Sequence, residues 1–212
     1  MLAAKRAGGG RTVPVLVTES GRVIGESDEI IRWVDTQVTA ERRLYRDGDA
    51  EAAAFVRQLD EGFGPAGRLW MYEQTLPVLK QMRPWALAGT PRWERAGLRL
   101  LAPLLDRGIR RYLGVGAHEA EAALREVDAV FDDVAQRLSD GRPFLFGDRF
   151  GAADLTFAAL AAPALLPARY GSPLPPIEAI PAGYAHEAAR LRDHPAGRFA
   201  ARMYDDERTW RT

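Results

Sequence analysis

Two kinds of hydrophobic pattern follow one another along the chain. Near its start, apolar runs over 12–17 and 23–24 flank a polar stretch around Gly21, which is typical of two short strands joined by a tight turn. Glu26 and Ser27 then open a helical pattern. From residue 48 onward apolar positions recur every three or four residues, which indicates helices. The pattern therefore predicts a small strand-containing piece followed by a long helical region.

The clearest amphipathic helix of that region is closed by Asp140-Gly141 and has five apolar residues on one face: Leu124, Val127, Phe131, Val134 and Leu138. An earlier stripe of Phe55, Leu59 and Phe63 runs into Gly64-Pro65, where a break or kink is expected. Apolar residues at helical spacing predict another helix over 98–109. The pattern after residue 166 predicts a loop over 167–183 and two short helices, around 185–192 and 196–207.

The segment from Phe144 to Leu160 predicts a loop that leads into a helix that is apolar on nearly all sides, over about 152–166. Such a helix belongs in the middle of a helical domain. Phe150 and Leu155 have the spacing of a hydrophobic staple around a cap at Gly151, and Asp154 can reach back to the cap amide. Because glycine has no side chain, half of the reciprocal capping box is lost. We assign this segment a role in the fold and none in catalysis.

The expected fold is mostly α. A partial α/β piece of two strands and one helix occupies residues 1–37, a linker 38–47, and an all-helical domain 48–212. The linker lies within the polar run from Thr36 to Asp49. No internal repeat is found.

Composition narrows the classes of function. Of 212 residues 47% are hydrophobic, and 29 acidic residues balance 29 basic ones, so nothing argues for nucleic acid or an anionic membrane as partner. We expect no membrane span and a cytoplasmic location. The absence of cysteine excludes disulfides and a cysteine nucleophile from this chain, and the three histidines lack metal-ligand spacing, so no metal is expected.

The candidate ligand-binding residues are Val13-Pro14 and Glu26-Ser27. A proline in an apolar strand is tolerated at an edge, a bulge or a cis peptide, and a cis bond would turn the backbone of Val13 outward to pair with an extended peptide. Ser27 is expected at the N-cap of the next helix, where amides and the helix dipole favour a carboxylate. Glu26 beside it could hold an ammonium group. Together these positions suit an α-amino acid head group.

Val13-Pro14 followed by Glu26-Ser27, with the Phe144–Leu160 segment downstream, resembles the glutathione S-transferase family. The resemblance implies a thioredoxin-like domain joined to an all-helical domain. It also implies that Val13 and Pro14 hold the cysteinyl part of glutathione, that Glu26 and Ser27 hold the γ-glutamyl end, and that the protein is a homodimer. Glutathione would be a co-substrate with a small electrophile.

In the family, an earlier strand-helix-strand unit carries the catalytic Tyr, Ser or Cys. Only about a dozen residues precede Val13, so we expect that unit to be missing and carry over no catalytic residue. Two explanations stay open: a misplaced start, or a remnant that covers its exposed strand edge with a second copy of the chain.

The resemblance also implies a pocket for the electrophile between the first helices of the helical domain. An aromatic and basic cluster lies there, although aromatic residues at helical spacing are most often core: Arg68, Trp70, Met71, Tyr72 and Trp85. The predicted function is conjugation or exchange of the glutathione thiol with a small electrophile. The alternative is a non-catalytic ligand-binding or protein-interaction module with a residual glutathione half-site.

Overall fold

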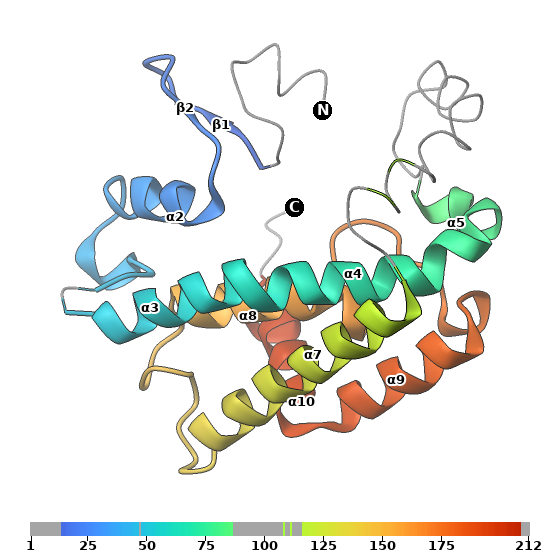
Figure 1. The fold of residues 1–212 in the computed structure, drawn as a ribbon. Coiled ribbons are helices and arrows are strands. Elements are labelled where there is room, and N and C mark those ends of the chain that lie inside the picture. Colours follow the sequence, from blue (N-terminus) through green and yellow to red (C-terminus); the bar gives the residue numbers. More distant parts are fainter. Residues whose placement is uncertain (1–13, 47, 87–107, 109–110, 112–115, 209–212) are drawn as a thin grey trace.

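A layer of helices forms the body of the protein, and a small hairpin and one helix lie beside it (Figure 1). The computed structural model describes residues 14–46, 48–86, 108, 111 and 116–208. Within these ranges the fold is mostly helical with one two-stranded sheet, as the sequence predicts. The predicted helix over 98–109 lies outside the described residues except for Gly108.

The hairpin pairs β1 (Leu16–Val17) with β2 (Val23–Ile24) in antiparallel register, Leu16 opposite Ile24 and Val17 opposite Val23. Gly21 takes a φ of +83°, the left-handed conformation that the turn requires. The strand is shorter than the apolar run that predicts it, and Pro14 lies before it without an amide to donate. Val17 is 48% exposed, an apolar side chain at the surface of a short strand.

Helix α2 (Ser27–Asp35) is joined to the helical body by its last residue. The buried Asp35 carboxylate accepts hydrogen bonds of 2.8 Å from the amides of Leu44 and Tyr45, and the Asp35 carbonyl accepts one from Arg43 Nε. A short 3-10 helix, η1 (Ala40–Arg42), lies between Asp35 and these donors in the chain. The segment proposed as a linker is thus held at both of its ends in this structure.

The first long helical run continues through the predicted break. It consists of α3 (Ala50–Gln58), the π-helical turn η2 (Leu59–Phe63), α4 (Gly64–Thr75), η3 (Leu76–Val78) and α5 (Leu79–Ala86). The break or kink expected at Gly64-Pro65 takes the form of this π-helical turn: the helical run continues, and the wider turn directly before Pro65 accommodates the ring and the missing amide. Phe55, Leu59 and Phe63 are all buried, as their spacing predicts.

Helix α7 (Ala117–Arg137) crosses α4, and α8 (Ala152–Leu165) lies behind it in the centre of the helical body (Figure 1). The chain then passes through η4 (Ile177–Ala179) to α9 (Ala182–Asp193), α10 (Pro195–Arg202) and a final π-helical turn, η5 (Met203–Glu207). Phe157 of α8 is fully buried, with its ring centroid 5.6 Å from those of Phe63 and Phe131. Apolar packing around Phe157 therefore joins α8 to η2 and to α7.

The start of α8 confirms the predicted half capping box. Asp154 is 2% exposed, and its carboxylate accepts 2.8 Å bonds from the cap amide of Gly151 and from the amide of Leu145. Burial raises the pKa of Asp154, while those two amide bonds oppose the shift. The carboxylate joins the loop before the helix to the helix itself.

Candidate functional site

The N-terminus of α2 is an open helix end. Glu26 is the N-cap, with an extended backbone (φ −105°, ψ 136°), and its side chain makes no capping bond in the described part of the chain. The first bond of the helix runs from the Ile30 amide to the Glu26 carbonyl at 3.0 Å. The amides of Ser27, Asp28 and Glu29 therefore have no acceptor within the helix and are oriented toward an incoming anion.

The expectation that Ser27 is the N-cap is wrong by one position. Glu26 holds that position, and Ser27 is the first helical residue. Both side chains are exposed at the helix mouth. The Ser27 hydroxyl is thus placed beside the open amides and does not cap them.

Asp28, one residue further, is held in place by two partners. Its carboxylate accepts a 2.8 Å bond from Arg32 Nε and a 2.5 Å bond from the hydroxyl of Tyr45, over whose ring the Arg32 guanidinium lies at 4.2 Å. Burial and the bond to Asp28 raise the pKa of Tyr45. Tyr45 therefore remains a neutral donor that fixes the first turn of α2 against the helical body.

A third carboxylate reaches this region from the helical domain. Asp60 lies in the π-helical turn η2, and burial raises the pKa of its carboxyl, followed by the negative charges of Asp28 and Glu26, while Arg68 opposes them. The charges of Asp28 and Glu26 thus act on Asp60, so this carboxylate shares the electrostatic environment of the mouth of α2. The sequence did not single out Asp60 or Asp28, because the electrostatic effect of one on the other arises only in the folded protein.

The combined site has two complementary parts. The amides of α2 supply a positive end, and Glu26, Asp28 and Asp60 supply negative charge beside it. Such an arrangement can bind a zwitterionic amino acid group, its carboxylate on the amides and its ammonium among the carboxylates. Pro14 is exposed, and Val13 lies outside the described residues, so the predicted backbone contact there stays a prediction.

Two of the five residues proposed for the electrophile pocket, Trp70 and Met71, border separate hollows in the described part of the chain. Trp70 is 2% exposed, packs edge-on against Tyr184 at 5.0 Å and borders a hollow of about 290 Å³, while Met71 borders a separate hollow of about 140 Å³. Arg68 is exposed, and its positive charge opposes the rise in the pKa of Asp60. Tyr72 and Trp85 are partly buried.

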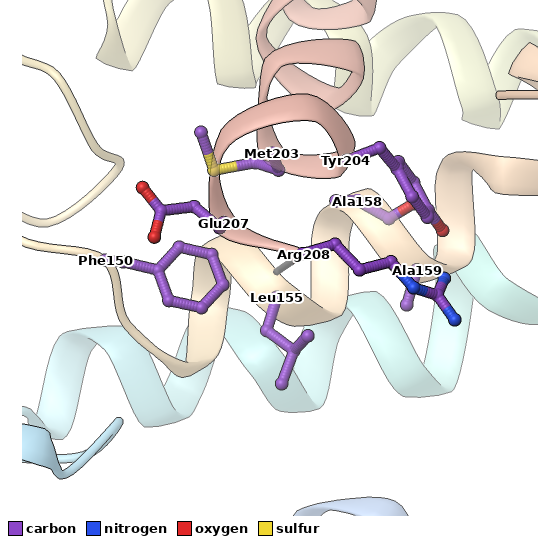
Figure 2. A pocket seen from close by; sticks show the side chains of 8 residues that line it. All are labelled: Phe150, Leu155, Ala158, Ala159, Met203, Tyr204, Glu207 and Arg208. Carbon is purple, nitrogen blue, oxygen red and sulfur yellow. The ribbon is translucent and has the colours of Figure 1, made fainter. Parts of the chain in front are cut away.

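A different cavity, of about 340 Å³, lies between α8 and η5 (Figure 2). Tyr204 is among its residues; its hydroxyl donates to the Ala158 carbonyl at 3.3 Å, and burial raises its pKa to about 12. The sequence indicated only the staple pair on its wall, not the cavity. It is lined by Phe150, Leu155, Ala158, Ala159, Met203, Tyr204, Glu207 and Arg208.

The fold and the site together define a class: a small α/β segment with an open helix mouth, attached to an all-helical domain. Comparison with protein families agrees with this class. A model of the glutathione S-transferase N-terminal domain matches residues 2–37, and a model of the glutathione S-transferase C-terminal domain matches residues 117–194. The chain belongs to the glutathione S-transferase family. Neither a curated protein nor a solved structure matches it significantly.

Two further properties follow from the described ranges. None of the helices described there combines the length and the hydropathy needed to cross a bilayer. The same residues form no cluster of three or more His, Cys, Asp or Glu side chains able to hold a metal ion.

Proposed function

We propose that this protein binds glutathione at the mouth of α2 and conjugates its thiol to a small electrophile or exchanges it in a related reaction. The observation that carries the proposal is the open N-terminus of α2, where Glu26 is the N-cap without a capping bond and the charges of Glu26 and Asp28 act on Asp60. The two family matches support it, since the first covers the whole of this mouth.

In the proposed complex the γ-glutamyl carboxylate accepts from the amides of the first turn of α2 and from the Ser27 hydroxyl. The ammonium group lies between Glu26 and Asp60. The cysteinyl part pairs with the backbone at Val13-Pro14. In conjugation, the glutathione thiol loses its proton to solvent, its sulfur forms a bond to an electrophilic carbon, and the leaving group departs with its electron pair. We assign no residue of this chain as catalytic.

The remaining features of the proposal follow the family resemblance. We propose a glutathione-binding domain over 1–37, a linker over 38–47 and a helical domain over 48–212, in a cytoplasmic homodimer. The pocket cluster of Arg68, Trp70, Met71, Tyr72 and Trp85 stays a proposal as well. Light scattering on the purified chain would test the dimer.

Replacing Ser27 with alanine is expected to weaken glutathione binding about tenfold, because a hydrogen bond to a charged group is lost. Isothermal titration calorimetry of the wild type and of Ser27→Ala measures the effect. Ser172→Ala, an exposed serine in the loop after α8, is the matched control and should bind as the wild type does. Equal affinity in Ser27→Ala would remove this helix mouth from the binding site.

Activity is tested with 1-chloro-2,4-dinitrobenzene and glutathione, followed by absorbance of the conjugate. Turnover above the rate with glutathione alone supports the transferase proposal. Glutathione binding without turnover of this or other electrophiles would favour the non-catalytic binding module.

Asp60→Asn is expected to have opposite effects on stability and on binding. The pKa of Asp60 is raised above the ordinary 3.8, so the folded state binds its proton more readily than the unfolded state does. Its contribution to stability is therefore present below the unfolded pKa and is lost as pH rises through the folded pKa. The asparagine variant should melt at a higher temperature than wild type at pH 7, and this advantage should vanish below pH 3.8.

The same variant should bind glutathione several-fold more weakly at pH 7, because the ammonium group loses one of its carboxylates. A variant that becomes more stable yet keeps full glutathione affinity would show that Asp60 is not part of the site. Thermal melts between pH 3 and pH 8, together with calorimetry at pH 7, separate these two outcomes.

A further inference from the structure

Tyr45, in the segment between α2 and α3, is held on both sides by backbone hydrogen bonds. The residue is 9% exposed, and its amide donates a 2.8 Å bond to the buried Asp35 carboxylate at the end of α2. The carbonyl of Leu44, directly before it, accepts a 3.1 Å bond from the Ala152 amide at the start of α8. Because its backbone is tied to both helices, the Tyr45 hydroxyl has a defined position in the fold.

That hydroxyl fixes Asp28, the second residue of α2. The Asp28 carboxylate accepts a 2.5 Å bond from the Tyr45 hydroxyl and a 2.8 Å bond from Arg32 Nε, one turn further along the helix. In the described part of the chain, these two side chains are its hydrogen-bond partners. The carboxylate is therefore bound by side chains, although it belongs to the first turn, where the backbone amides are open.

A carboxylate released at this place in a helix tends to bind the amides of its own first turn. Aspartate side chains accept hydrogen bonds from nearby backbone amides, and the positive end of the helix dipole favours a negative charge there. The amides of Ser27, Asp28 and Glu29 are the donors on which the proposed function places the γ-glutamyl carboxylate. An unrestrained Asp28 side chain would compete with the ligand for these donors.

We propose that Tyr45 is a positioning residue for glutathione: its hydroxyl holds the Asp28 carboxylate away from the amides and so keeps them open for the ligand. The inference rests on the proposed function, since it concerns the same helix mouth. Arg32 assists, but its ion pair with Asp28 is partly exposed, and such pairs contribute little. The buried tyrosine, fixed through its backbone, is the donor that decides where the carboxylate lies.

The test is calorimetry with glutathione on Tyr45→Phe, which removes only the hydroxyl, and on the double variant Tyr45→Phe/Asp28→Ala. We expect Tyr45→Phe to bind about fivefold more weakly than wild type, the strength of one competing capping interaction. The double variant should bind several-fold more tightly than Tyr45→Phe, because the competing carboxylate is gone. Tyr170→Phe, at a half-buried tyrosine in the loop after α8, is the matched control and should bind as the wild type does.

A purely structural role of Tyr45 predicts a different result for the double variant. If the hydroxyl served only to attach α2 to the helical body, removal of Asp28 could not restore that bond, and the double variant would bind no better than Tyr45→Phe. That result, or equal affinity of Tyr45→Phe and wild type, would overturn the proposal. Thermal melts of each variant, with calorimetry well below the lowest midpoint, keep unfolding out of the measured affinities.

Amide hydrogen exchange in the ligand-free proteins, followed by NMR, tests the same restraint without glutathione. In Tyr45→Phe the amides of 27–29 should exchange several-fold more slowly than in wild type, because Asp28 then accepts from them, and the double variant should return to the wild-type rates. Unchanged or faster exchange in Tyr45→Phe would overturn the inference. Failure of the wild type to bind glutathione would contradict the proposed function, while slower exchange would still support the restraint of Asp28 by Tyr45.

Discussion

Asp154→Ala is expected to lower the free energy of unfolding by about 4 kcal/mol. The variant loses two hydrogen bonds to a carboxylate and leaves two buried amides without an acceptor. The Asp154 carboxylate accepts from Gly151, at the cap of α8, and from Leu145, in the loop before it, both at 2.8 Å. Gly151 has no side chain to cap the helix. The variant therefore loses the bonds that fix the start of the central helix.

Urea unfolding followed by circular dichroism measures this loss. Asp154→Asn should lose about 2 kcal/mol, because its carbonyl can accept one of the two amide bonds while its amino group cannot accept the other. Asp148→Ala, at an exposed position in the same loop, should stay within about 0.5 kcal/mol of wild type. An alanine variant as stable as wild type would mean that this carboxylate does not hold the loop to the helix.

Gly197→Ala should destabilise the protein by about 4 kcal/mol or more, because the added methyl group has no room. A Cβ at Gly197 would lie 1.8 Å from the carbonyl oxygen of Leu191 and 3.1 Å from the Cα of Arg192. These are backbone atoms of α9, so no side chain can rotate away. The variant must separate α9 from α10 at their junction, where the core is closed by Ala196 and Ala200.

Gly67→Ala is the matched contrast for this prediction. Its Cβ would meet only the carbonyl oxygen of Leu160, at an ordinary 3.8 Å, and Gly67 lies inside α4. Removing a helix-interior glycine should stabilise the protein by about 0.5–1 kcal/mol. Thermal melts of both variants should therefore move in opposite directions from wild type. A Gly197→Ala variant that melts with the wild type would contradict the close approach of α9 and α10.

Local patterns predicted the parts of the fold that depend on neighbours in the chain. The apolar spacing of Val127, Phe131 and Val134 identified α7, and all three side chains are buried. The cap at Gly151 and the hydrogen bond from its amide to Asp154 could likewise be predicted, since the two residues are three positions apart. At Gly64-Pro65 the local rule located the distortion but not its form, since the chain takes a widened π-helical turn there and continues as a helix.

Some residues of the candidate site could be predicted from local sequence, and others only from the tertiary structure. Glu26 and Ser27 were found from the sequence, because a helix N-terminus has a recognisable local composition. Asp60 was not, since the charges of Glu26 and Asp28 act on it only in the folded protein. The cavity between α8 and η5 was also missed, because its walls come from two segments, 150–159 and 203–208, that are far apart in the chain.

The sequence by itself determined the helices, the open mouth of α2 and, through its resemblance to a family, the expectation of glutathione. Tertiary structure alone decided that the charges of Glu26 and Asp28 act on Asp60 and that a cavity lies between α8 and η5. The physical reason is that backbone hydrogen bonds and amphipathic spacing act within a few residues. Electrostatic proximity and cavity shape depend instead on packing between segments that the chain order does not bring together.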